Sequence, residues 1–106
     1  MPKYLWRLSY SQQAVKGLLE EGGSSRREAT AKLIQDQGGS LETFYFAFGE
    51  TDVFCIATLP DDATAAAVSL AVSAAGAGSV ATTRLLDPED IDEASRKSIG
   101  YRAPGE

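Results

Sequence analysis

The sequence LETFYFAF (residues 41–48) is joined by GET (49–51) to DVFCIATL (52–59). Both runs are rich in aromatic and β-branched residues, and a short glycine-containing link between two such runs predicts a β-hairpin. If Phe48 lies opposite Asp52, one face of the hairpin carries large apolar residues and the other carries residues of mixed size. The first face comprises Phe44, Phe46, Phe54 and Ile56, and the second comprises Leu41, Thr43, Tyr45, Ala47, Val53, Cys55, Ala57 and Leu59. Because both faces are largely apolar, we expect neither to face water.

The chain before the hairpin predicts a strand followed by a broken helical crossover. Residues 4–10 have strand composition, Ser11 offers an N-cap, and the apolar spacing over residues 11–37 is helical. A pair of glycines at 22–23 interrupts this helical segment. Ser25 and Glu28 fit a capping box, which predicts that a second helix starts at Ser25.

The chain after the hairpin predicts a helix, a fourth strand and a short terminal helix. An alanine-rich helix begins with the acidic residues after Pro60 and runs to about Ala75. Residues 79–86 are rich in Val and Thr and predict a strand. Pro88 suits the first position of a further short helix. Residues 96–106 lack periodicity, so we expect a flexible tail.

The order strand, helix, strand, strand, helix, strand predicts an α+β fold of the ferredoxin-like βαββαβ type over residues 1–95. Two helices cover only one face of its four-stranded antiparallel sheet, and we expect the face with Phe44 to lie under them. The other hairpin face then has no cover, and an uncovered apolar patch of that extent is typical of an interface. A second copy packed sheet against sheet would cover it, so we expect a homodimer or higher homo-oligomer.

Composition narrows the classes of function. The chain has 15 Asp and Glu residues and 10 Lys and Arg residues, which gives a net charge of -5. This negative charge disfavours nucleic acid and anionic membranes as partners. The chain has no histidine, which is the commonest general base and metal ligand, so we expect no metal and no cofactor. It has one cysteine, no recognisable signal peptide and no apolar run long enough to span a membrane, so we expect a cytoplasmic protein.

Six short motifs follow one another along the chain: MPKYL (1–5), GLL (17–19), EGGSSRRE (21–28), FYFAFG (44–49), LPD (59–61) and LAVSA (70–74). In this order they resemble the GYD-domain family, and the resemblance covers roughly residues 1–92. It implies a dimeric α/β barrel of the ferredoxin-like class, and it implies no particular reaction. The family carries Gly, Tyr and Asp at the hairpin. Gly49 and Asp52 match this pattern, whereas Thr51 stands where Tyr is expected.

The run GGSSRR (22–27) is the first candidate site. Its glycines allow close backbone approach, and Arg26 and Arg27 add two guanidinium groups, a combination that suits a phosphate or a carboxylate. The alternative is a helix break whose arginines are solvated or paired with the neighbouring glutamates.

Two further groups of residues are candidates. Thr43, Tyr45 and Cys55 are the polar members of the second hairpin face, where a dimer can enclose a cavity and a hydroxyl can orient a ligand. The alternative is packing in a dimer core, with Cys55 as an inert small hydrophobe. Arg7 lies mid-strand among apolar neighbours and needs an ion-pair or ligand partner unless it is exposed at an edge. Asp52, beside the turn, contacts a ligand or simply bonds local backbone.

We therefore expect a small soluble dimer that binds a small organic or anionic ligand in a pocket between sheet and helices. The residues expected to contact the ligand are Arg7, Arg26, Arg27, Thr43, Tyr45 and Asp52. The alternative is a non-catalytic assembly or regulatory module that acts through oligomer contacts. A cavity lined by Tyr45 and Arg7 would favour the first hypothesis, and a fully packed dimer core the second.

Overall fold

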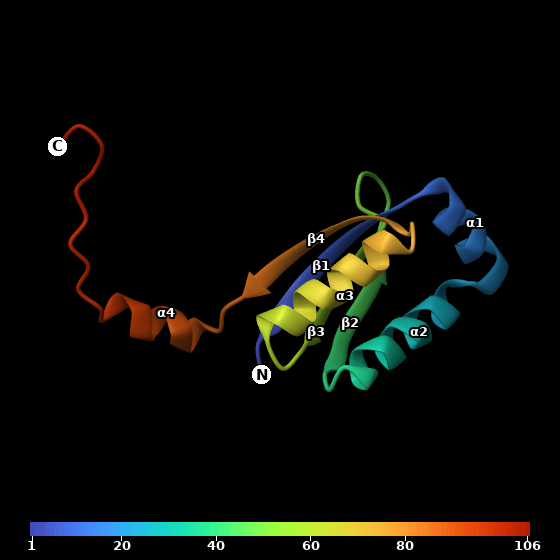
Figure 1. Cartoon of the computed structure of the whole chain (residues 1–106), viewed down its shortest axis with the longest axis horizontal. Coiled ribbons are helices and arrows are strands. Elements are labelled where there is room, and N and C mark those ends of the chain that lie inside the picture. Colours follow the sequence, from blue (N-terminus) through green and yellow to red (C-terminus); the bar gives the residue numbers. More distant parts are fainter.

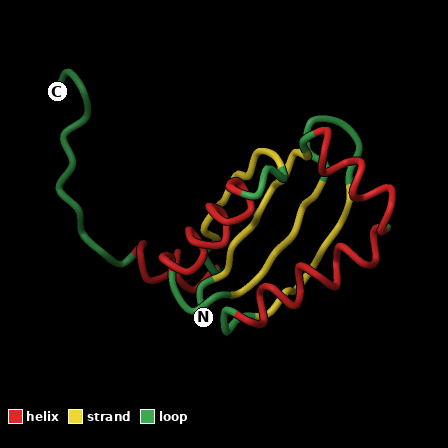
Figure 2. The backbone as a smooth tube through the Cα atoms, turned by 45° about the vertical axis from the view of Figure 1, so that its right-hand side comes forward, coloured by secondary structure: helices red, strands yellow, loops and turns green.

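The computed structural model describes all 106 residues. Its elements are β1 (Lys3–Tyr10), α1 (Gln12–Glu21), α2 (Gly23–Asp36), β2 (Ser40–Phe46), β3 (Val53–Thr58), α3 (Asp62–Ala74), β4 (Gly78–Leu85) and α4 (Pro88–Ser95). The strands form one antiparallel sheet in the order β2-β3-β1-β4. Helices α1, α2 and α3 lie over one face of the sheet (Figure 1). In Figure 2 the strands are seen between α3 on one side and α1 and α2 on the other. This is the ferredoxin-like α+β fold expected from the sequence.

Side-chain caps fix where α1 and α3 begin. The Ser11 hydroxyl accepts a hydrogen bond from the Ala14 N–H at 3.1 Å, as expected for the N-cap of α1. The Asp61 carboxylate accepts one from the Thr64 N–H at 2.8 Å and starts α3 in the same way. Both helices therefore begin where the sequence predicted.

The break between α1 and α2 lies at a single residue. Gly22 has a φ of 87°, a region that favours glycine, and its N–H donates to the Leu18 carbonyl at 2.8 Å, which closes α1. The next helix starts at Gly23, so Ser25 lies inside the first turn of α2. The prediction that a capping box at Ser25 starts this helix is wrong, because the glycine lets the chain re-enter helix two residues earlier.

The hairpin forms, but its register differs by one residue from the prediction. Phe44 pairs with Cys55 and Phe46 pairs with Val53, whereas the sequence argument placed Phe46 opposite Phe54. Because side chains alternate along a strand, a slip of one residue moves the whole of β3 to the opposite face relative to β2. The predicted register is therefore wrong.

The physical cause is an anchor between the turn and β1. The link between the two strands spans residues 47–52, longer than the three residues predicted. The Asp52 N–H donates to the Leu8 carbonyl at 2.9 Å, and the Asp52 carboxylate accepts from the Tyr10 N–H at 2.7 Å. The Ala47 N–H then bonds the Asp52 carbonyl at 2.9 Å. These bonds hold Asp52 where it cannot pair with Phe48.

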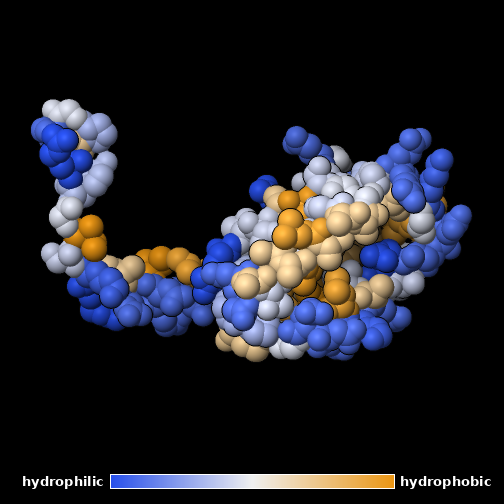
Figure 3. All heavy atoms as spheres, in the orientation of Figure 1, coloured by the Kyte–Doolittle hydropathy of each residue, from blue (hydrophilic) through white to orange (hydrophobic).

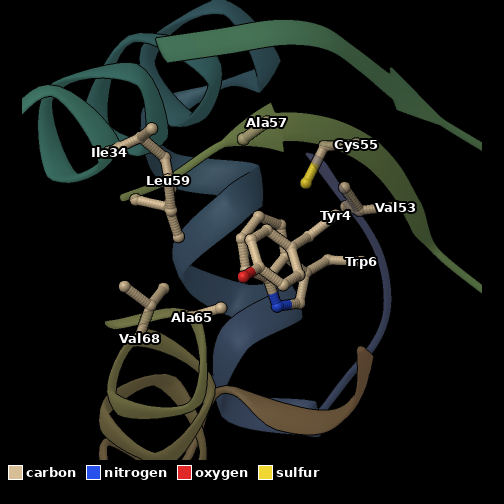
Figure 4. Packing of buried hydrophobic residues seen from close by; sticks show 9 residues of the cluster. All are labelled: Tyr4, Trp6, Ile34, Val53, Cys55, Ala57, Leu59, Ala65 and Val68. Carbon is tan, nitrogen blue, oxygen red and sulfur yellow. The ribbon is translucent and has the colours of Figure 1, made fainter. Parts of the chain in front are cut away.

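This register brings the small residues of β3 under the helices. Val53, Cys55, Ala57 and the following Leu59 are buried there, although the sequence argument placed them on the uncovered face. Figure 4 shows them packed with the aromatic rings of β1 and with α2 and α3. The buried cluster comprises Tyr4, Trp6, Ile34, Val53, Cys55, Ala57, Leu59, Ala65 and Val68.

A β-bulge in β2 explains why Leu41 lies on the opposite face from the one predicted. Leu41 pairs with Ala57 and Thr43 pairs with Ile56, so Glu42 is an extra residue between two ladder positions. The bulge places Leu41 on the helix side, where it packs against the buried cluster instead of lying on the uncovered face. Glu42 in turn forms an ion pair with the Lys3 ammonium at 3.0 Å.

The face turned away from the helices has no cover within the chain. Two rows of cross-strand neighbours form its centre, and we call these residues the open face: Tyr45, Phe54 and Arg7 in one row, and Thr43, Ile56 and Leu5 in the next. Phe54 and Ile56 belong here and not under α3, which corrects the predicted partners of that helix. An apolar face without helices exists as expected. Of the predicted set, Thr43 and Tyr45 lie on it, whereas Leu41, Val53, Cys55, Ala57 and Leu59 lie on the helix side.

Residues 87–106 project from the domain as an arm (Figure 1). α4 forms as predicted, with Pro88 in its first turn and a capping box between Asp87 and Asp90. The side-chain hydrogen bonds of the arm all stay within the arm. Figure 3 shows hydrophobic residues on the arm. Ile91 and Ile99, both in this segment, are 56% and 78% exposed.

Candidate functional site

A cavity of about 400 Å³ lies between the helices and the sheet. Its floor is formed by three residues of β1 and one residue each of β2, β3 and β4. Its walls are formed by α1 and α2 on one side and α3 on the other. Of its 22 lining residues, 15 are hydrophobic, so most of the surface offered to a guest molecule is apolar. Figure 3 looks onto this side of the molecule, where apolar residues gather along and beside α3.

The cavity exists because the helices present small residues to it. α1 turns a face towards the cavity that includes Ala14, Gly17 and Leu18, with the glycine at its centre. A Cβ atom added at Gly17 would meet no heavy atom within 4 Å. On the opposite wall, Ala75 and Gly76 directly follow α3, and their small size also leaves the space open.

The polar atoms on the α3 side of the cavity already have partners. The Trp6 indole N–H donates to the Ser69 hydroxyl at 2.9 Å, and that hydroxyl lies 2.6 Å from the hydroxyl of Thr82. Ser69 also donates to the Ala65 carbonyl at 3.2 Å. These groups are satisfied within the chain, so this side of the cavity acts as an apolar surface.

The opposite side, where α1 meets α2, carries the charged groups of the cavity. Arg26 and Glu21 both line it, with the guanidinium Nη1 3.5 Å from the carboxylate Oε1. Their side chains are 41% and 38% exposed, so this end of the cavity reaches solvent. Burial raises the pKa of the Tyr10 phenol and Arg26 opposes that shift, while Asp52 and Glu21 add to it more weakly. Tyr10 therefore keeps its proton at neutral pH and faces the cavity as a neutral hydroxyl.

Cys55 lies in the cavity wall as an unreactive thiol. Burial raises its pKa to about 11, so the nucleophilic thiolate is absent at neutral pH. Figure 4 shows its sulfur directed towards the rings of Tyr4 and Trp6. This agrees with the interpretation of Cys55 as a small hydrophobe. No group of three or more His, Cys, Asp or Glu side chains is arranged to hold a metal ion.

The six residues expected to contact a ligand fall into separate places. Arg26 lines the cavity, and none of the other five does. Arg27 lies with Thr43 and Tyr45 along a shallow groove at the open edge of β2. Arg7 is exposed on the open face, beside Phe54 in the neighbouring strand. The structure thus brings Arg27, Thr43 and Tyr45 together, and it separates all three from Arg26.

Asp52 occupies the last of these places, at the turn. Its carboxylate accepts the Tyr10 N–H and its own N–H bonds Leu8, so both groups are engaged with β1. The residue bonds backbone, as one of the two sequence interpretations had it, although the backbone belongs to a distant strand. Its position explains the strand register directly.

Sequence reasoning did not identify Tyr10, Gly17 or Ser69 as cavity residues. Two of them carried a signal that could have been used. Gly17 interrupts the apolar face of a predicted helix, which indicates space in front of that face. Tyr10 lies on the same side of its strand as Trp6, and therefore on the buried side. Ser69 gave no signal, because its partner Trp6 is remote in sequence.

Comparison with known proteins supports the assignment of family. The family model for the GYD domain matches residues 4–95, which spans every element from β1 to α4. No curated protein and no solved structure shows significant similarity to the chain. None of the four helices combines the length and the apolar character that crossing a membrane requires. The match covers most of the sequence, and the chain belongs to the GYD domain family.

Proposed function

We propose that this protein binds a small, largely apolar organic molecule in the cavity between its helices and its sheet. The observation that carries the proposal is the cavity itself, about 400 Å³ in volume with mostly hydrophobic walls. Ligand sites in proteins typically measure roughly 300–1,000 Å³ and combine apolar walls with a few polar groups. The few polar groups here are those of the end where α1 meets α2.

The proposal includes a homodimer formed through the open face. Leu5, Phe54 and Ile56 form a contiguous apolar centre on neighbouring strands, and no helix of the chain lies over it. A two-fold axis would bring the same surface of a second copy against this centre, which suits a face without its own cover. This face also supports the second candidate function, an assembly module that acts through oligomer contacts.

The experiment for ligand binding fills the cavity from α1. N-phenyl-1-naphthylamine, a neutral apolar dye, is titrated into the protein and its fluorescence is followed. In the Gly17→Leu variant the new side chain enters the cavity, since Gly17 is at the centre of the lining face and has open space before it. We expect saturable binding to the unaltered protein and at least tenfold weaker binding to the variant.

Lys16→Leu is the matched control. Lys16 is the neighbour of Gly17 in α1 but is exposed and does not line the cavity, so the same side chain is added outside it. We expect this variant to bind the dye as the unaltered protein does. Circular dichroism melts show whether each variant folds. Equal dye affinity in all three folded proteins would contradict the proposal.

A further inference from the structure

The charges that face the cavity lie at one end only. Arg26 is the one cationic residue that lines it and Glu21 is the one anionic residue, and both belong to the junction of α1 and α2. Trp6, Cys55 and Val68 mark the buried side of the cavity. A molecule that fills the whole space therefore meets apolar surface along its length and hydrogen-bonding groups at one tip.

From this polarity we infer that the ligand is an amphipathic monoanion, with a hydrocarbon body in the cavity and a carboxylate or similar head beside Arg26 and Tyr10. The inference rests on the proposed function, because it concerns the same cavity. It adds the chemical class of the ligand and the residues that select it.

The guanidinium of Arg26 retains most of its capacity to bind an anion. Its contact with Glu21 is long, at 3.5 Å, and both side chains are about two-fifths exposed. Exposed ion pairs of this kind are weak, since water screens them and the long side chains lose freedom in forming them. A guanidinium has five N–H donors, so a planar carboxylate can bind it through two oxygens at once.

Tyr10 lies at the position proposed for the head group, and its pKa shows whether positive or negative charges have the larger effect there. The pKa of Tyr10 is raised first by burial, and Arg26 opposes this more strongly than the carboxylates of Asp52 and Glu21 reinforce it. The hydroxyl thus lies in surroundings where the guanidinium has the larger influence of the two charge types. It retains its proton and can donate a hydrogen bond to an anionic head.

The carboxylate of Glu21 repels an anionic ligand. The direction in which affinity changes when Glu21 is replaced therefore shows whether the ligand is an anion or a cation. Removing its charge while keeping its shape, as in Glu21→Gln, leaves Arg26 without a competing partner. An anionic head should then bind more tightly, whereas a cationic head should bind more weakly. The same substitution therefore separates the two classes of ligand.

The experiment compares three ligands with the same eight-carbon chain, octanoate, 1-octanol and octylammonium, by isothermal titration calorimetry at pH 8. We expect octanoate to bind at least tenfold more tightly than 1-octanol, and octylammonium to bind most weakly. Arg26→Gln should remove the advantage of octanoate and leave the affinity for 1-octanol unchanged. Tyr10→Phe should weaken octanoate severalfold, and Glu21→Gln should tighten it.

Arg27→Gln is the matched control, because Arg27 carries the same charge one residue along and does not line the cavity. It should change none of the three affinities. If 1-octanol binds as tightly as octanoate, or octylammonium binds best, the inference is overturned while the cavity remains a ligand site. If none of the three binds, the proposed function fails and the inference fails with it.

Discussion

Cys55 and Tyr4 make the folded chain sensitive to alkali. Burial raises the pKa of Cys55 from 9.0 to about 11. Burial and the hydrogen bond from the Tyr4 hydroxyl to the Asp62 carboxylate, at 2.5 Å, raise the pKa of Tyr4 from 10.0 to about 12. In each case the folded state holds its proton over a pH range in which the unfolded state has released it. Both groups therefore lower the stability as the pH rises.

The sign and the pH window follow from these pKa values. Below pH 9 neither group makes the free energy of unfolding depend on pH. The free energy of unfolding should fall from pH 9 to 11 because of Cys55 and from pH 10 to 12 because of Tyr4. Between pH 9 and 10 the Cys55 part amounts to about 1 kcal/mol. Urea unfolding of the unaltered protein and of Cys55→Ala at both pH values measures it. Parallel losses in the two proteins would show that the thiol does not titrate as expected.

Arg26 and Tyr10 show what single residues reveal about the site before any fold is known. Arg26 stood out in the sequence because it follows two glycines, and the structure places it on the cavity. Tyr10 shared a face of its predicted strand with Trp6, but that signal does not distinguish a residue of the packed core from a residue of a cavity. Tyr10 matters because a cavity lies between its strand and α1. A cavity forms where side chains from segments distant in sequence leave space between them unfilled. That information is not local to any residue.

At the level of elements, two glycines of this chain should respond in opposite ways to alanine. A Cβ at Gly39, just before β2, would lie 2.0 Å from the Thr58 carbonyl oxygen, whereas one at Gly17 meets nothing within 4 Å. Gly39→Ala should destabilise the protein by about 1–3 kcal/mol, because the backbone must shift. Gly17→Ala should stabilise it by about 0.5–1 kcal/mol through the helix propensity of α1.

Urea unfolding of both variants at pH 7 tests this pair. The two substitutions are chemically identical, so the difference between them isolates the surroundings of each glycine. A loss of stability in Gly17→Ala would mean that the space in front of α1 is not open. A neutral Gly39→Ala would mean that the chain before β2 does not lie as close to β3 as described.

The elements themselves could be predicted because their signals are local. Ser11, Asp61 and Pro88 mark helix starts through contacts within a few residues, and all three were identified. The register of β2 against β3 could not, because Asp52 fixes it through hydrogen bonds to Tyr10 and Leu8, which lie in a strand made much earlier. Gly49, with a φ of 113°, and Asp52 thus share one turn.

At the scale of the whole molecule, the open face is the proposed contact between two copies, and this proposal predicts the oligomeric state. Phe54 lies at its centre, and Phe54→Lys would place a second cation beside Arg7 in the proposed contact between two copies, where burial of unpaired charge is costly. We expect the unaltered protein to be a dimer at micromolar concentration and this variant to be a monomer. Light scattering coupled to size exclusion measures both masses.

Phe48→Lys provides the comparison for this experiment. It makes the same substitution in the turn between β2 and β3, where Phe48 is fully exposed and lies off the open face. This variant should remain a dimer. A monomeric unaltered protein, or dissociation by both substitutions alike, would contradict a contact through the open face.

The strand order has a consequence for how the chain acquires its fold during synthesis. β1 is made before the other three strands of the sheet, yet it lies inside the sheet between β3 and β4. Its first neighbour, residues 53–58, is made only after α1, α2 and β2, and its second, residues 78–85, only after α3. Pairings so distant in sequence require closure of long loops and slow the search for the native state. Of the two strands inside the sheet, β1 is made first but is the last to be paired along both edges, and the surroundings of its aromatic residues are incomplete until β4 has been made.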